Sequence, residues 1–252
     1  MAKRTDSNIY TIVFAVIMVI VVGSLLAFIA NTLKPRISEN ERLEKMQNIL
    51  YAMGINNNNP EKPNSVVFIP VTEAGKAFNQ YIVKQYVVEG NNIAEGDAFS
   101  IDLAKEEALA KNPSYQKRLP IFVGKKDENT YYIVPLRGKG LWDAIWGYIS
   151  LDENLVIQGA FFDHAGETPG LGANIKERFF MDDFIGENIL DASGNFAGVT
   201  VFKGNNDPEN QRKTDNKVDA ISGSTITGNG VSAMISTYLK QYYPHIQTLV
   251  NQ

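Results

Sequence analysis

The sequence contains no cysteine and only two histidines, His164 and His245. Without cysteine the chain forms no disulfide bond, thiolate zinc site or iron–sulfur centre of its own, and it offers no cysteine nucleophile. Two histidines argue against a His-rich metal site or a bis-histidine haem. We therefore expect a structural role for each histidine and no bound metal.

Basic residues are too few for a nucleic-acid surface. The chain holds 24 Lys and Arg against 28 Asp and Glu, a formal net charge of −4. Residues 1–36 contain four basic residues and one acidic residue, which leaves residues 37–252 with a formal charge of −7. Because an acidic domain repels a phosphate backbone, no nucleic-acid partner is expected.

Motifs for direct nucleotide chemistry are missing as well. No Gly-x-Gly-x-x-Gly fingerprint follows a predicted strand and no Walker loop is present, so no NADH site is expected on this chain. The adjacent carboxylates Glu106-Glu107 and Asp182-Asp183 diverge on a helix. We interpret them as solvated faces and predict no catalytic side chain.

One long apolar run is present near the start of the chain. Ile9 to Ala30 is a stretch of 22 residues without charge, roughly 33 Å long as a helix, which matches the hydrocarbon core of a bilayer. A secretory signal has a shorter apolar region of about 7–15 residues, so the run predicts an uncleaved anchor in contact with membrane lipid. Lys3 and Arg4 precede it and Lys34 and Arg36 follow it, so charge alone does not give the orientation.

Residues 37–118 are predicted to form a helix-rich membrane-proximal region. Ser38-Glu39-Asn40-Glu41 resembles a capping box that begins a helix ending at Gly54, although this helix could instead continue from the span. The Asn- and Pro-rich segment 55–63 is predicted to be a loop. Hydrophobic spacing predicts two further helices, over 72–85 and 101–111.

Residues 119–252 are predicted to form a second region, in which the pattern changes to short β-branched and aromatic runs. Segments 119–123, 130–136, 146–151 and 155–162 are typical of an antiparallel sheet. A helix is expected over 175–184, a strand over 198–202, and a long helix from Thr225 to Tyr242 that Pro244 ends. The expected fold class is α+β: one N-terminal transmembrane helix (residues 1–36) followed by a mixed domain with a mainly antiparallel sheet flanked by helices.

The segment Asp219-Ala220-Ile221-Ser222-Gly223-Ser224-Thr225-Ile226-Thr227 lies where a loop enters that last helix. Its small residues let the backbone approach a ligand closely, and the free N–H groups of a helix N-terminus favour a phosphate. The simpler alternative is that Ser222 or Ser224 only caps the helix.

This segment resembles the flavinylation motif of the FMN-binding domain family, Asp-x-x-Ser/Thr-Gly-Ala-Thr, from Asp219 to Thr225. The resemblance implies that a flavin transferase takes FMN from FAD and joins its phosphate to Thr225, not Thr227, as a phosphoester. It also implies cofactor-binding roles for Asp219, Ser222, Gly223 and Ser224. Ser224 departs from the motif, which has Ala at this position.

Two further stretches resemble the same family. Gly166-Glu167-Thr168-Pro169-Gly170-Leu171-Gly172 is similar to its Glu-Thr-Pro-Gly-Leu-Gly loop, and implies that Glu167, Thr168, Leu171 and Gly172 line the flavin ring. Gly138-Lys139-Gly140-Leu141-Trp142 resembles the Gly-x-Gly-Leu-Trp segment of the C subunits of sodium-translocating NADH:quinone oxidoreductases. Leu141 and Trp142 are expected near the ring, although Trp142 could equally be a core residue.

The resemblance implies an electron-transfer subunit that relays electrons from NADH toward ubiquinone through covalent FMN, while partner subunits export sodium. It also implies a single-pass protein of the cytoplasmic membrane with its main domain on the periplasmic side. Two alternatives stay open: the equivalent G subunit of the Rnf ferredoxin-linked complex, and a membrane-anchored flavin sensor.

Overall fold

The computed structural model describes residues 8–62 and 64–251, and the chain divides into two compact units, Met1–Glu44 and Lys45–Gln252. The N-terminal unit consists of most of helix α1 (Asn8–Ala52). Within the described residues, α1 is the one helix long and apolar enough to cross a membrane, with a mean hydropathy of 3.1 in its most apolar window. Its apolar side chains, such as Ile9 and Phe28, are exposed, as an anchor requires. Lys3 and Arg4, the two basic residues before the apolar run, lie outside the described residues.

No new helix begins at Ser38. Helix α1 continues without a break through Pro35 and the capping-box residues to Ala52, so the alternative of a helix running on from the span is confirmed. Its last turns belong to the second unit, where Ile49, Leu50 and Ala52 are fully buried. Burial of this apolar face outweighs the local start signal, because packing usually contributes more than a cap.

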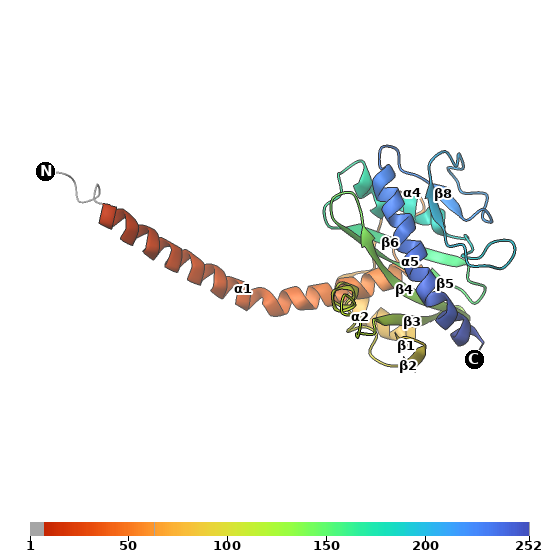
Figure 1. Ribbon diagram of the computed structural model, residues 1–252, viewed down its shortest axis with the longest axis horizontal. Coiled ribbons are helices and arrows are strands. Elements are labelled where there is room, and N and C mark those ends of the chain that lie inside the picture. Colours follow the sequence, from red (N-terminus) through yellow and green to blue (C-terminus); the bar gives the residue numbers. More distant parts are fainter. Residues whose placement is uncertain (1–7, 63, 252) are drawn as a thin grey trace. The chain divides into compact units, whose positions relative to one another are not determined.

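The second unit is built on a six-stranded antiparallel sheet in the order β2-β1-β3-β4-β5-β6 (Figure 1). The strands are β1 (Ile82–Glu89), β2 (Asn92–Glu95), β3 (Arg118–Lys126), β4 (Asn129–Lys139), β5 (Ala144–Leu151) and β6 (Ile157–His164). The four strands predicted after residue 118 are confirmed, as is the α+β class. Strands β1 and β2 were not predicted: helix α2 (Val71–Tyr81) stops where β1 begins, and β1 pairs with β3 along its length.

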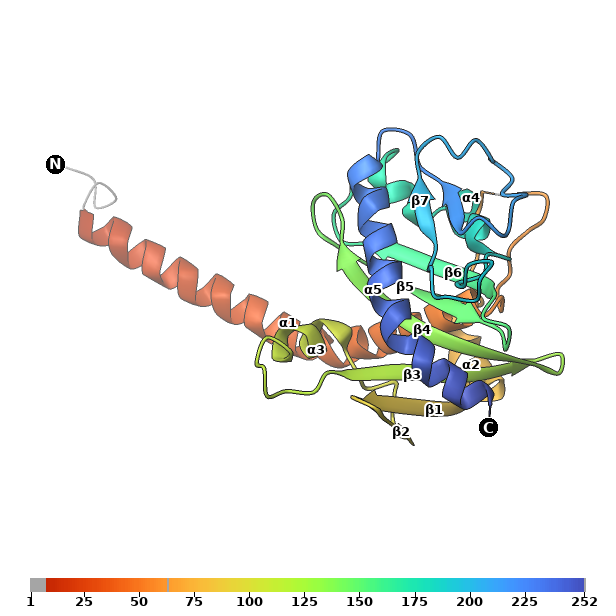
Figure 2. The same ribbon diagram turned by 45° about the vertical axis from the view of Figure 1, so that its right-hand side comes forward.

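Helix α5 (Thr225–Val250) lies across one face of the sheet and passes over β4 (Figure 2). Two glycines permit this close approach, since a Cβ at Gly230 would lie 2.3 Å from the carbonyl oxygen of Lys139 and one at Gly138 would meet Met234 at 2.8 Å. The predicted end at Pro244 is wrong. Ile246 and Leu249 are buried beyond it, and this burial offsets the cost of an interior proline.

The remaining elements surround the start of α5. After β6 the chain forms three short turns, η2 (Gly172–Lys176), α4 (Arg178–Met181) and η3 (Asp182–Phe184), in place of the single helix expected over 175–184. Strand β7 (Thr200–Phe202) is confirmed but pairs in parallel with β8 (Lys217–Asp219), which leads directly into α5.

The interpretation of the paired carboxylates as solvated faces needs a correction. Helix α3 (Leu103–Leu109) carries Glu106, which is 1% exposed and pairs with Arg118 at 2.7 Å. Tyr115 and the backbone N–H of Arg118 also donate to its carboxylate. Glu106 is therefore a buried, fully bonded link between α3 and β3.

Candidate functional site

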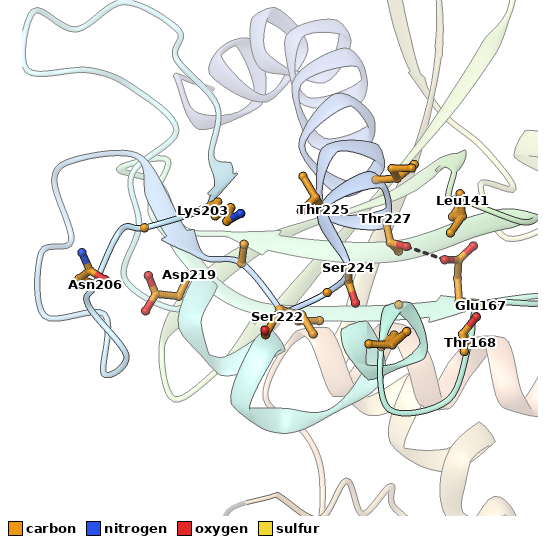
Figure 3. Close-up of a pocket in the computed structure, with 17 residues that line it drawn as sticks. Leu141, Glu167, Thr168, Lys203, Asn206, Asp219, Ser222, Ser224, Thr225 and Thr227 are labelled. Atoms are coloured by element: carbon orange, nitrogen blue, oxygen red, sulfur yellow. Dashed lines mark hydrogen bonds between the residues drawn. The ribbon is translucent and has the colours of Figure 1, made fainter.

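A cavity of about 560 Å³ opens at the N-terminus of α5, within the size range of small-molecule sites (Figure 3). Four segments far apart in the sequence border it. Its lining residues are Leu141, Glu167, Thr168, Leu171, Gly172, Lys203, Gly204, Asn206, Asp219, Ala220, Ile221, Ser222, Gly223, Ser224, Thr225, Ile226 and Thr227. The three motifs singled out in the sequence thus meet at one place, and of the residues predicted from them only Trp142 is not part of the wall.

The four hydroxyl groups of the last motif differ sharply in accessibility. Thr225, the first residue of α5, and Ser222 are exposed, whereas Ser224 and Thr227 are buried. The Thr227 hydroxyl is already engaged, because it donates to Oε2 of Glu167 at 2.5 Å. Thr225 and Ser222 therefore carry the hydroxyls of this motif that another molecule can reach.

The helix start is not capped by a side chain. Ser224 stands at the N-cap of α5 but makes no capping hydrogen bond. The alternative that the motif serves only to cap the helix through Ser224 is therefore wrong. The first amides of a 26-residue helix therefore face the cavity edge with the positive end of the helix dipole. Such an end stabilises an anion such as phosphate.

Glu167 joins three of the bordering segments. Its carboxylate accepts hydrogen bonds from the Thr227 hydroxyl and from the backbone N–H of Trp142 at 2.9 Å, and its own N–H donates to Nδ1 of His164. Burial alone would raise the pKa of Glu167, but the hydrogen bonds that its carboxylate accepts from Thr227 and Trp142 outweigh burial and hold the pKa below its usual value. Glu167 is thus a charged residue, 4% exposed, whose hydrogen bonds hold three segments of the cavity wall together.

The apolar part of the cavity comes from Leu141 and Leu171, whose side chains are 45% and 41% exposed. Trp142 is 66% exposed, so it is not a core residue. Its Nε1 donates to Oγ1 of Thr168 at 3.2 Å, which holds the indole beside the cavity-lining loop. An aliphatic surface with an aromatic neighbour suits a flat apolar ring.

Two glycines allow the walls of the cavity to pack closely. A Cβ at Gly172 would lie 2.5 Å from both Oε2 of Glu167 and Oγ1 of Thr227. Gly223 has a φ of +75°, and a Cβ there would lie 2.9 Å from Leu171. Glycine therefore fits at both positions without displacing the neighbouring side chains.

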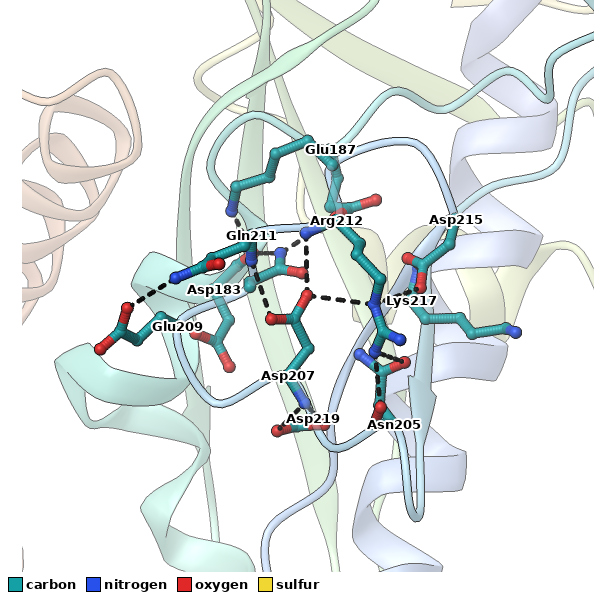
Figure 4. A network of polar contacts seen from close by, with 12 residues as sticks. Asp183, Glu187, Asn205, Asp207, Glu209, Gln211, Arg212, Asp215, Lys217 and Asp219 are labelled. Atoms are coloured by element: carbon teal, nitrogen blue, oxygen red, sulfur yellow. Dashed lines mark hydrogen bonds and ion pairs between the residues drawn. The ribbon is translucent and has the colours of Figure 1, made fainter.

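Asp219 acts on the loop that precedes it, residues 203–216. Its carboxylate accepts the backbone N–H of Asp207, and Asp207 in turn accepts from the N–H groups of Gln211 and Arg212 (Figure 4). This network holds Lys203 and Asn206 at the cavity wall. Figure 3 shows the Lys203 ammonium on the same side of the cavity as Thr225. Sequence reasoning missed Lys203 and Asn206, because a single Lys or Asn in a loop carries no pattern of its own.

Comparison with known proteins assigns the family. Residues 140–240 match the family model described as an FMN-binding domain. The C subunit of the Na+-translocating NADH-quinone reductase from Pseudomonas aeruginosa is 29% identical over 255 residues, covering 93% of this chain and 92% of that protein. Its counterpart from Pasteurella multocida is 29% identical and covers 96% of this chain and 93% of its own length.

Solved structures agree. NqrC from Shewanella oneidensis, at 20% identity and a TM-score of 0.63, shows the same fold. The crystal structure of the C subunit from Parabacteroides distasonis is 36% identical with a TM-score of 0.70, and the match covers 85% of this chain and 96% of that one. The chain therefore belongs to the family formed by the C subunits of the Na+-translocating NADH-quinone reductases.

Proposed function

We propose that this domain carries FMN as a phosphoester on Thr225 and relays electrons within a membrane-bound NADH-quinone reductase. The observation that carries the proposal is the position of Thr225: an exposed hydroxyl on the first residue of an uncapped helix, at the rim of a cavity of suitable size. Ser222 and Gly223 lie in the turn before it and Asp219 holds the loop that faces it.

The residues present fit FMN. The N-terminus of α5 and the Lys203 ammonium suit the phosphate, while Leu141 and Leu171 suit the ring, with Thr168, Gly172 and Glu167 at its polar side. Gly172 and Gly223 let the cavity walls pack closely, because a Cβ at either position would collide with a wall residue. When bound, FMN supplies the reversible redox chemistry that no side chain of this chain offers. The chain's own part is to hold the ring, exclude water from one side and keep the walls fixed through Glu167.

Attachment would be made by a flavin transferase. Transfer of the FMN part of FAD forms a bond between Oγ1 of Thr225 and the phosphorus, breaks the FAD pyrophosphate, and releases AMP. Thr227 is excluded as acceptor by its burial and its bond to Glu167. The relatives named above are C subunits of the sodium-translocating enzyme, which favours that complex over Rnf and over a sensor.

The labelling experiment tests this directly. The chain is made with and without a flavin transferase, and covalent flavin is detected as in-gel fluorescence and as a mass increase of FMN minus one water. Thr225→Ala should abolish both signals. Thr227→Ala and Thr237→Ala should keep them, the latter being the matched control because Thr237 is an exposed threonine of the same helix outside the motif and the cavity wall. If Thr225→Ala keeps the label and one of the other two variants loses it, the flavin is attached to that other residue and not to Thr225.

A further inference from the structure

The side chain of Ser224 is buried at the cavity edge without a hydrogen-bond partner. The residue is 6% exposed, and its Oγ has no partner among the residues that the structure describes. It makes no capping bond to the first turn of α5. Ser224 borders the cavity, and Figure 3 shows its oxygen directed from the start of α5 toward the side that carries Glu167 and Thr168.

A hydroxyl in this position is unfavourable for the flavin-free chain. Burying a hydroxyl with no compensating hydrogen bond destabilises a protein, whereas alanine at the same place would have no polar atom to satisfy. Ser224 also differs here from the flavinylation motif, which has Ala. A buried, unpartnered hydroxyl at the edge of a cavity points to a ligand that satisfies it when bound.

We propose that Oγ of Ser224 donates a hydrogen bond to the phosphoribityl part of the flavin, which makes Ser224 a positioning residue for the cofactor. The inference rests on the proposed attachment to Thr225. Ser224 is the neighbour of Thr225, so the phosphate and ribityl oxygens come within its reach, whereas Leu141 and Leu171 form the apolar wall that suits the ring. Binding thereby removes an energetic penalty that the empty site carries.

The test compares Ser224→Ala with the wild-type chain in flavin-free and flavinylated forms. The full chain is purified in detergent and its thermal unfolding is followed by circular dichroism. In the flavin-free form the variant should melt about 2–4 °C higher than wild type, because the unsatisfied hydroxyl is gone. In the flavinylated form it should melt lower than wild type, because the hydrogen bond to the cofactor is lost. The ring absorption spectrum should not change.

Ser232→Ala is the matched control, a serine on the same helix whose hydroxyl is already satisfied. Its Oγ donates to the carbonyl of Gly228 at 3.0 Å and accepts the N–H of Val201 at 2.9 Å. This variant should lower both melting midpoints by the same amount.

Two results would overturn the inference while leaving the attachment intact. If Ser224→Ala shifts both forms equally, Ser224 does not contact the flavin; if it shifts the ring spectrum, the contact is with the ring and not the phosphoribityl chain. A wild-type chain that takes no label refutes the attachment to Thr225, and this inference with it.

Discussion

The hydroxyl of Thr227 donates to Oε2 of Glu167 at 2.5 Å, and this contact joins the first turn of α5 to the loop after β6. The two residues are 60 positions apart in the sequence and both are nearly fully buried. The other oxygen of Glu167 accepts the N–H of Trp142, so the same carboxylate also fixes the loop between β4 and β5. The cavity therefore depends on one charged group for the placement of three of its walls.

Thr227→Val tests this dependence. The substitution keeps the shape but removes a donor from a buried carboxylate, so the free energy of unfolding should fall by about 1–3 kcal/mol. The bond from Thr227 helps to lower the pKa of Glu167 in the folded chain. The stabilisation from this bond is therefore present above the unfolded pKa near 4.5 and is lost as the pH falls through the folded pKa of Glu167. Urea unfolding at pH 7 should thus separate variant from wild type more than unfolding in acid. If Thr227→Val and wild type differ by the same amount at both pH values, the bond does not affect the pKa of Glu167. Covalent labelling of Thr225 should persist in this variant.

A methyl group at Gly172 should damage the same contact from the other side. In Gly172→Ala the new Cβ would lie 2.5 Å from both Glu167 and Thr227, and overpacking of this kind costs about 1–3 kcal/mol. We expect lower stability and a changed flavin absorption spectrum. Gly166→Ala, in the same loop, meets only Cβ of Asp143 at 3.6 Å and should leave both nearly unchanged. If the two variants change stability and the flavin spectrum equally, the loop is only a turn and does not line the flavin site.

The pH dependence of stability should reveal an acidic group beside the motif. Burial, with the charge of Asp219 next, raises the pKa of Asp183 to about 7. A raised pKa means that the folded chain holds a proton that the unfolded chain releases between about pH 4 and pH 7, so stability falls as pH rises through this window. Asp183→Asn should therefore raise the melting midpoint by roughly 2–4 °C at pH 8 and change it little at pH 5. The exposed Glu209→Gln should show no such difference; an Asp183→Asn effect of the same size at both pH values would contradict the raised pKa.

Local patterns in the sequence predicted most strands and the start of α5, and the motifs around Thr225 and Glu167 led to residues that meet at one cavity. The errors share a physical cause. Pro244 and the Ser38 capping box are local end and start signals, and in both places burial of an apolar helix face overrode them. The start of strand β1 was predicted to be helical, because its partner β3 is distant in the sequence. Lys203 was missed because a loop held by Asp207 and Asp219 positions it, and such a loop leaves no pattern in the sequence.

The membrane orientation is a prediction that reporter fusions can check. We propose that α1 crosses the cytoplasmic membrane once and that the domain lies on the periplasmic side, since an uncharged helix of this length spans a bilayer and the family resemblance supplies the side. A reporter active only in the periplasm, fused after Gln252, should be active, and a cytoplasmic reporter at the same place should be silent. The opposite pattern would reverse the proposed topology.

The relay itself is tested in membranes that contain the whole complex but lack flavin on Thr225. In the proposed arrangement, covalent attachment would keep the cofactor on the chain through repeated redox changes, and a membrane anchor would raise the effective concentration of the domain near its electron donor and acceptor. We propose that NADH is oxidised on a partner subunit, in keeping with the sequence expectation of no NADH site on this chain. In membranes carrying Thr225→Ala, NADH oxidation by an artificial acceptor should therefore persist, whereas sodium-stimulated quinone reduction should fall to background. Thr237→Ala membranes, with the label retained, should keep both activities. Quinone reduction at the wild-type rate without flavin on Thr225 would refute a relay between NADH oxidation and the quinone, because electrons would then have passed the site without its cofactor.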